Sequence, residues 1–351
     1  MAREEKRGSF WGLGWRQTVS VALILAASLF FLPVLLVRGE PVYQRAGPGE
    51  SGEALPPMAP ASSAVQTGAR DKGRAVRLQM KDGSVTELTM ADYLWGVAAA
   101  EMPASFEPEA LKAQVCAART YTVVLQDGGS GKHPDADICA DSACCQAYIE
   151  RSDAEIRWGL NAREYGEKIE QAVAQTDGLG VFYGGKPSQA LFFSSAAGRT
   201  TDAVEVWGSS VDYLKSVDSP EGDEVPNYRT QVTLGAEEVR SLTLDAYPGA
   251  DLSGDPSAWF GEASRNEAGG VRSIPLGGVT LTGGQVRSLF SLRSASFTVT
   301  WDGGRFVFDV TGYGHGVGMS QYGANAMAKN GSSFQDILTW YYTGTQVSEL
   351  W

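Results

Sequence analysis

The chain has 351 residues, of which 43% are hydrophobic and 20% are charged. This composition is typical of a folded globular protein rather than a coiled coil or a disordered chain. The formal net charge of −12 argues against a general nucleic-acid-binding role, because binding to phosphates requires clustered cations.

The N-terminal region contains one strongly apolar segment. Residues 18–37 carry no charged side chain, and about 20 apolar residues suffice for a helix to cross a bilayer. Because basic side chains precede this segment, residues 1–17 are expected to lie in the cytoplasm and residues 38–351 outside the membrane. A cleaved signal peptide is the alternative, which the length of the apolar run and the lack of a small-x-small cleavage pattern disfavour.

The next segment has the composition of a tether. Residues 38–73 are rich in Gly, Pro, Ala and Ser and lack periodic apolar positions, which predicts a flexible linker. A folded domain is expected over residues 74–351. It begins with two alternating runs around Asp82-Gly83, the pattern of a β-hairpin.

Two helices are predicted after the hairpin. Thr89 has the properties of an N-cap for a helix over residues 90–101, which Pro103 ends. A second helix is expected over residues 108–126. The later part of the chain turns to strands, before a final helix at residues 333–342. Early helices followed by strands that we expect to be antiparallel predict an α+β fold, compatible with two lobes around a cleft.

One carboxylic acid stands out on the first helix. Met90, Leu94, Val97 and Glu101 recur at helical spacing, so Glu101 ends an apolar stripe. Burial disfavours the charged form and raises the pKa of a carboxyl group, which suits a general acid near neutral pH. An exposed glutamate in the last turn is the alternative.

Two cations lie on the second helix. Lys112 and Arg119 are seven residues apart and share one face. Together they could hold sugar hydroxyls or position a carboxylate, whereas solvated surface charge is the alternative interpretation.

A short loop collects three of the four cysteines and one of the two histidines. His133, Cys139, Cys144 and Cys145 fall within thirteen residues, while Cys116 lies in the second helix. Thiolate and imidazole ligands at this spacing favour zinc. A disulfide between Cys139 and one of its neighbours is the alternative, and local reasoning leaves both open.

A glycine-rich segment near the C-terminus, GYGHGVGMSQYG at residues 312–323, includes His315. It lacks the GK[ST] signature of a phosphate-binding loop. A nucleophile pair of Ser194 with His315 is conceivable, but no GxSxG elbow surrounds the serine. The role of His315 stays open between a base and a packed, hydrogen-bonded side chain.

Three long motifs resemble those of one family. They read DYLWGVAAAEMPASFEPEALKAQVCAARTY, SSAAGRTTDAVEVWGSSVDYLKSV and GHGVGMSQYGANAMA. Over nearly all of residues 75–345 the chain resembles the stage II sporulation protein D family.

The resemblance implies a lytic transglycosylase that cleaves the bond between N-acetylmuramic acid and N-acetylglucosamine in peptidoglycan, on strands without stem peptides, during forespore engulfment. It implies Glu101 as the catalytic acid, with Lys112 and Arg119 in substrate handling. Further expected substrate contacts are Tyr148, Ser194, Gln321 and Tyr322. Hydrolysis with a second carboxylate remains open.

The resemblance also implies a structural zinc ion bound by His133, Cys139 and Cys145. Cys145 is preferred over Cys144 because adjacent residues seldom bind one metal. Expected partners are glycan strands, the sporulation proteins P (an amidase) and M (a membrane protein), and the expected location is the mother-cell membrane facing the forespore. The alternative function is a non-catalytic glycan-binding module that modifies a cell-wall amidase.

Overall fold

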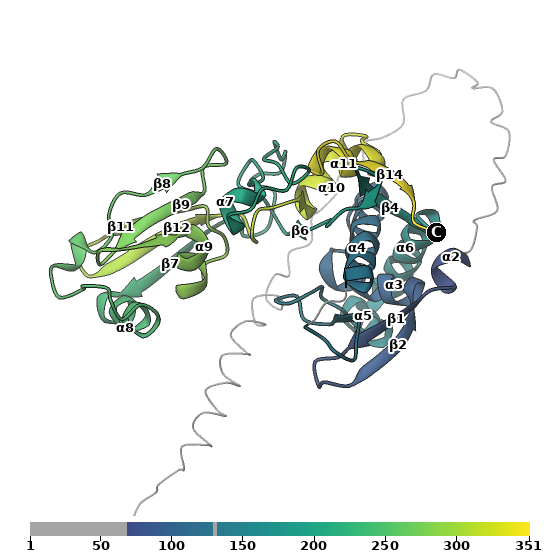
Figure 1. Cartoon of the computed structure of the whole chain (residues 1–351), viewed down its shortest axis with the longest axis horizontal. Coiled ribbons are helices and arrows are strands. Elements are labelled where there is room, and N and C mark those ends of the chain that lie inside the picture. The colour runs from purple at the N-terminus through teal and green to yellow at the C-terminus, as the bar shows by residue number, and fades with distance from the viewer. Residues whose placement is uncertain (1–68, 129–131) are drawn as a thin grey trace, which may run out of the picture. The chain divides into compact units, whose positions relative to one another are not determined.

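The structure is a computed structural model and describes residues 69–128 and 132–351 (Figure 1). The expected cytoplasmic N-terminus at residues 1–17, the expected membrane span at residues 18–37 and the expected linker as far as residue 68 lie outside the described residues.

The expected membrane location requires a correction. In the part of the chain that the structure describes, no helix is both long enough and apolar enough to cross a bilayer. The longest described helix, α4 (Pro108–Gly128), has 21 residues but carries four charged side chains. This finding contradicts the prediction of a single-pass membrane protein as far as the described residues extend.

The first part of the described chain is mainly helical. Its helices are α2 (Ala69–Lys72), α3 (Met90–Glu101), α4, α5 (Arg151–Trp158) and α6 (Ala162–Gln175), with a 3-10 turn, η2, at Gly159–Asn161. Two helices from the end of the chain, α10 (Gln321–Lys329) and α11 (Phe334–Tyr341), also contact α4. Both ends of the described chain therefore pack around one central helix.

Three small sheets accompany these helices. The first has the order β2-β1-β3 and consists of β1 (Ala75–Gln79), β2 (Val85–Thr89) and β3 (Ile138–Cys139). The second has the order β14-β4-β5 and consists of β4 (Leu179–Tyr183), β5 (Lys186–Pro187) and β14 (Gln346–Glu349). The third is a parallel pair of β6 (Phe192–Phe193) and β13 (Met319–Ser320). The predicted hairpin turn at Asp82-Gly83 joins β1 to β2.

The middle of the chain contributes antiparallel sheets. After the short helix α7 (Ala203–Trp207), the order is β7 (Arg229–Gly235), α8 (Ala236–Ala246), η3 (Pro256–Ala258), β8 (Ser264–Arg265), β9 (Val271–Leu276), β10 (Val279–Thr282), α9 (Gly283–Leu289), β11 (Phe297–Trp301) and β12 (Arg305–Thr311). The sheets have the orders β11-β12-β7 and β10-β9-β8. The predicted α+β class is confirmed.

Helix α3 begins and ends at the predicted residues. The Thr89 hydroxyl accepts a hydrogen bond from the Asp92 backbone N–H, which satisfies one of the free donors of the first turn. Met102 is already extended, as expected for a residue that precedes a proline. The helix therefore stops at Glu101, which places this carboxyl group at its C-terminal end.

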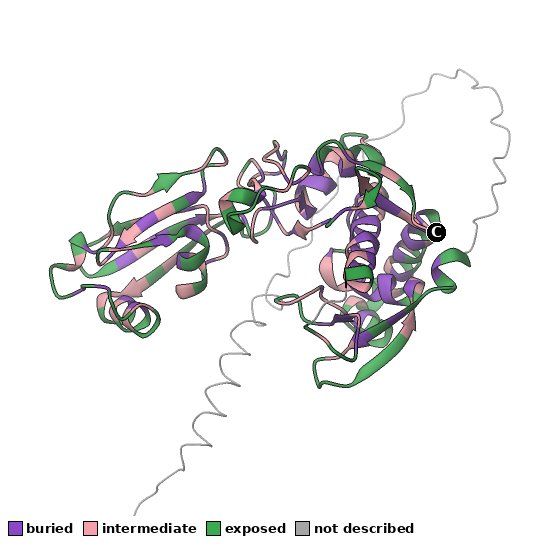
Figure 2. Ribbon diagram, in the orientation of Figure 1, coloured by how far each residue is buried: buried purple, intermediate pink, exposed green. Residues whose placement is uncertain are grey.

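Two separate groups of buried apolar side chains form the interior. The first surrounds α3 and α4, where Tyr93, Leu94 and Leu111 are fully buried, and Figure 2 shows the buried faces of these helices. The second lies between the middle sheets and includes Phe306 and Phe308. The buried face of α3 fixes the helix that carries Glu101.

Candidate active site

The carboxyl group of Glu101 lies in a partly buried environment. Its Oε1 accepts a hydrogen bond from the Ala147 backbone N–H at 2.6 Å. Burial raises the pKa of Glu101, while the Ala147 N–H and the Gln321 side chain lower it in part. The net direction is upward, which keeps a larger fraction of this group protonated near neutral pH.

A cavity of about 600 Å³ opens beside this carboxyl group. Ser194 and Gln321, both expected from the sequence, line it together with Glu101. Among the described lining residues, Glu101 is the one carboxylic acid and Arg287 the one side chain with a permanent positive charge. Five other acidic residues are candidates for the second carboxylate of a hydrolase, and none of them is among the residues that line this cavity: Asp135, Asp137, Asp141, Asp202 and Glu205.

The glycine-rich segment shapes this cavity through close backbone packing. Gly318 has a φ of +80°, and a Cβ atom there would collide with the Leu191 carbonyl oxygen. The close approach lets β13 pair with β6, and the Tyr322 backbone N–H then donates to the Ser194 carbonyl at 3.0 Å. The glycines therefore join two distant segments of chain at the cavity wall.

His315 also lines the cavity, but its ring nitrogens are both used. Nε2 lies 3.1 Å from the Phe192 carbonyl and therefore donates to it, while Nδ1 accepts from the Val317 backbone N–H at 3.2 Å. Burial lowers the pKa of His315 to about 4. The ring is thus a neutral, packed side chain, and this arrangement leaves neither nitrogen for a nucleophile pair with Ser194.

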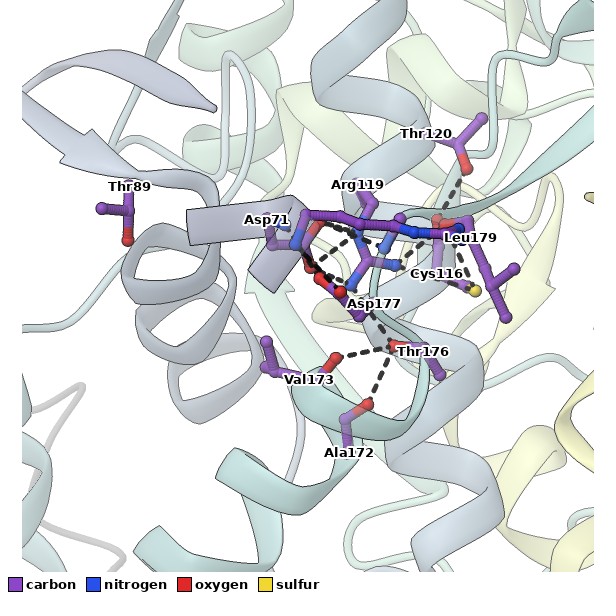
Figure 3. A network of polar contacts seen from close by, with 12 residues as sticks. Asp71, Thr89, Cys116, Arg119, Thr120, Ala172, Val173, Thr176, Asp177 and Leu179 are labelled. Carbon is purple, nitrogen blue, oxygen red and sulfur yellow. Dashed lines mark hydrogen bonds and ion pairs between the residues drawn. The ribbon is translucent and has the colours of Figure 1, made fainter. Parts of the chain in front are cut away.

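Arg119 is fully buried and does not reach the cavity. Its guanidinium group binds the buried Asp71 carboxylate, with Nη2 to Oδ2 at 2.6 Å, and donates to the Leu179 carbonyl at 2.9 Å. Figure 3 shows this network, which also includes Thr176. Through these contacts Arg119, which lies on α4, connects α4 to α2 and to the start of β4.

Lys112 also lies away from the cavity. Its ammonium group forms an ion pair with Glu109, one turn earlier on α4, and lies 5.3 Å from the centre of the Phe334 ring. The structure therefore does not bring Lys112 or Arg119 together with Glu101.

The two expected tyrosine contacts pack against other aromatic rings. Tyr148 stacks on Tyr93 with the ring centres 6.2 Å apart. Tyr322 meets Phe106 edge to face at 4.9 Å. Neither tyrosine is among the residues that line the cavity.

The Cys/His loop forms a compact cluster of possible metal ligands. The donor atoms of His133, Cys139, Cys144 and Cys145 all lie within 4.8 Å of one another. His133 Nδ1 is 2.8 Å from Gln79 Oε1 and therefore donates to it. That hydrogen bond leaves His133 Nε2 to face the sulfur atoms of Cys144 and Cys145, at 3.5 and 3.4 Å.

This cluster could hold a metal ion, and all its cysteines are free thiols. Three thiols and one imidazole are a donor set that suits a four-coordinate structural site. Cys144, which the sequence interpretation set aside, belongs to the cluster as closely as Cys145. The same loop also reaches the cavity, since Ser142 and Cys145 are among its lining residues.

Sequence reasoning missed Arg287 and Tyr313 as cavity residues. Arg287 comes from the last turn of α9, in a part of the chain where no motif was recognised. Tyr313 lies within the glycine-rich segment, so its neighbours in sequence could have indicated it.

Comparison with known proteins gives the family of this chain. A family model described as "Stage II sporulation protein" matches residues 79–183. The chain is 36% identical to stage II sporulation protein D of Bacillus subtilis (strain 168) over 328 residues, 93% of this chain and 94% of that protein. It is 38% identical to stage II sporulation protein D of Bacillus amyloliquefaciens over 267 residues, 76% of each chain.

A third relative has a different name. The chain is 27% identical over 313 residues to a Bacillus subtilis (strain 168) protein named "Amidase enhancer", covering 73% of this chain and 40% of that protein. The long matches to the sporulation proteins, at above 30% identity over most of both chains, establish that this chain belongs to the stage II sporulation protein D family.

Proposed function

We propose that this protein is a lytic transglycosylase that cleaves peptidoglycan glycan strands during sporulation, with Glu101 as its catalytic acid. The observation that carries the proposal is the isolation of Glu101: it is the one carboxylic acid among the described residues that line its cavity. Hydrolytic glycosidases commonly use two carboxylates that flank the scissile bond. A reaction in which a single group first gives and then takes a proton matches this site better.

In the proposed reaction Glu101 gives up one proton and receives one back. Glu101 donates its proton to the glycosidic oxygen between N-acetylmuramic acid and N-acetylglucosamine as the bond from that oxygen to C1 breaks. The C6 hydroxyl oxygen of the muramic residue forms a new bond to C1, and its proton returns to Glu101. The products are a 1,6-anhydromuramic end and a free C4 hydroxyl on the adjacent N-acetylglucosamine, and no water is consumed.

The surrounding residues support this cycle. A raised pKa keeps Glu101 protonated before the reaction, and the Ala147 N–H stabilises the carboxylate that forms when the proton leaves. Gln321 and Ser194 line the cavity, where they are placed to contact sugar hydroxyls. Lys112 and Arg119 are proposed to act on the fold rather than on the substrate, as is the stacked Tyr148.

Zinc is the proposed metal of the Cys/His cluster. The donor set of His133, Cys139, Cys144 and Cys145 fits tetrahedral zinc, which would hold the loop that supplies the Ala147 N–H. We propose a structural role, because four protein ligands leave no open position for a substrate or water.

The family resemblance further supports action beside the sporulation proteins P and M. An amidase such as protein P would remove stem peptides and so prepare the strands. Residues 74–351 would then form the peptidoglycan-cleaving domain.

The test is an analysis of the reaction products. The purified protein and its Glu101→Gln variant are incubated with glycan strands stripped of peptides, and the products are identified by mass spectrometry. The proposal expects 1,6-anhydromuramic ends from the wild type and a loss of rate of at least about 100-fold in the variant.

Other products would change the assignment. Reducing ends would mean hydrolysis. Binding of strands without cleavage would favour a non-catalytic modifier of an amidase, the function that the 27% identity to an amidase enhancer supports.

A further inference from the structure

Arg287 is a cation without a protein partner in the cavity of Glu101. Its Nε donates to the Arg293 carbonyl at 3.2 Å, and this bond fixes the side chain at the end of α9. Within residues 69–128 and 132–351, no carboxylate lies within 4.0 Å of its guanidinium group and its two terminal nitrogens have no hydrogen-bond partner. Five N–H donors are therefore present, and four of them are free for a ligand.

The charge of the protein makes this arrangement unusual. Acidic side chains outnumber basic ones by 12, so a cation in a partly buried position has many possible partners. Arg119 shows the usual solution, since its guanidinium group is neutralised by Asp71. Burial of the Arg287 guanidinium lowers its pKa, and a buried charge is costly unless an opposite charge accompanies it. A substrate that brings a carboxylate would supply that opposite charge.

The proposed substrate carries one carboxylate in a suitable place. In peptidoglycan, the muramic residue bears a lactyl group on the same ring as the carbon that is attacked. While a stem peptide is attached, the lactyl carboxyl group is an amide and has no charge. Removal of the peptide leaves a free carboxylate, which a guanidinium group can bind through two parallel hydrogen bonds.

We propose that Arg287 binds the lactyl carboxylate of the muramic residue and thereby selects strands that have lost their peptides. This inference rests on the proposed function, because it assigns the substrate to the cavity of Glu101. Arg287 acts as a specificity-determining residue: it distinguishes a carboxylate from an amide at one position of the sugar, and it takes no part in proton transfer.

The test compares two strands that differ only at this position. One preparation is peptide-free glycan with its lactyl carboxylates intact, and the other is the same glycan after chemical conversion of those carboxylates to primary amides. Cleavage by the wild type should favour the carboxylate strand by about tenfold or more in kcat/KM, the value of one charge-assisted interaction. The Arg287→Gln variant should cut both strands at similar kcat/KM, and Arg287→Lys should restore part of the preference.

Arg305→Gln is the matched control, because Arg305 is an exposed arginine on β12, in the same part of the chain. It should keep the full preference. An equal loss on both strands in Arg287→Gln, or a wild type without preference, would overturn the inference. If the wild type cuts neither strand, the proposed function fails, and the affinities of the two strands for wild type and variant then decide the role of Arg287 separately.

Discussion

The Ala147 backbone N–H donates to Glu101 Oε1 at 2.6 Å, which joins the end of α3 to a loop 46 residues further along the chain. Ala147 comes two residues after Cys145, a member of the Cys/His cluster. The N–H group that binds the Glu101 carboxyl group therefore belongs to the same loop that could hold a metal ion. We expect this proximity to couple metal binding to the geometry of the acid.

Metal removal should reduce activity even though the metal is not proposed to touch the substrate. A chelator, or the Cys139→Ser substitution, frees the loop and weakens the hydrogen bond to Glu101. Loss of one hydrogen bond to a charged group typically costs about 10- to 100-fold. Metal content by mass spectrometry, melting temperature and cleavage rate should fall together. The control is Cys116→Ala, which changes a cysteine outside the cluster and should keep its metal. A metal-free protein with full cleavage activity would contradict the expected coupling.

Cys144 should be a metal ligand. In protein loaded with cobalt(II), the sulfur-to-metal charge-transfer absorption grows with the number of bound thiolates. Cys144→Ala should lower that absorption by about one third, because three thiolates become two. An unchanged spectrum would show that Cys145 binds without Cys144, as the sequence interpretation supposed.

Gln321 should influence the pH dependence of cleavage. Its side chain lowers the pKa of Glu101, whereas burial raises it. A general acid works only while protonated, so activity falls as the pH rises through its pKa. Gln321→Leu removes a group that lowers the pKa and should move this fall to higher pH. Profiles normalised to their own maxima test the shift, and Gln335→Leu, at an exposed position on α11, should leave the profile in place.

The raised pKa of Glu101 also predicts a pH-dependent cost in stability. A carboxyl group whose pKa is higher in the folded than in the unfolded state binds more protons when folded. The contribution of Glu101 to the free energy of unfolding is therefore greatest below the ordinary pKa of 4.5. It declines as the pH rises through the pKa that Glu101 has in the folded protein. The Glu101→Gln variant should not show this decline, because a glutamine side chain does not ionise. It keeps a side-chain oxygen that can accept the hydrogen bond from the Ala147 N–H.

The melting temperature of Glu101→Gln should therefore match that of the wild type near pH 4 and exceed it by about 2 °C at pH 7. Glu155→Gln, at an exposed position on α5, provides the control and should show no such divergence. A difference that does not change with pH would rule out ionisation of Glu101 as its cause.

Arg119 should matter for stability and not for substrate binding. Arg119→Met leaves the buried Asp71 carboxylate unpaired, which should lower the free energy of unfolding by about 3–5 kcal/mol. The double variant Asp71→Leu with Arg119→Met removes both charges and should recover most of this loss. Denaturant unfolding measures both effects.

Activity assays on the same variants separate the two roles of Arg119. Below its melting temperature, Arg119→Met should retain a KM close to that of the wild type, as should Arg157→Met on the exposed face of α5. A folded Arg119→Met protein with a strongly raised KM would restore the substrate role that the family resemblance implied.

Local patterns predicted those features that local forces determine. Helix α3 was predicted to the residue, because its N-cap hydroxyl and the proline after it act within a few residues. The apolar stripe likewise indicated the burial of Glu101. The three predicted metal ligands lie together in the Cys/His cluster, and Cys144, which a rule about adjacent residues disfavours as a ligand, has its donor atom within the same 4.8 Å.

Contacts between residues that are far apart in the chain could not be predicted from the sequence. Helical spacing showed that Lys112 and Arg119 share a face, but it could not show what that face meets. The partner of Arg119 is Asp71 on α2 (Ala69–Lys72), within the stretch that composition assigned to the linker. Arg287 reaches the cavity only through the packing of α9, and no nearby residue indicates it.

The Asp71–Arg119 ion pair would also decide which elements first carry a mechanical load applied to α2. In the described chain α2 precedes β1, so a pull applied at the N-terminal end of α2 would reach Asp71 before it reached the first described strand. The backbone N–H groups of Arg70 and Asp71 donate to the Asp177 carboxylate at 3.0 and 2.8 Å, next to the ion pair. The load therefore passes to the long helix α4 and to the turn before β4. The β1–β2 hairpin follows α2 in the chain, so such a load would meet the ion pair before it could separate β1 from β2.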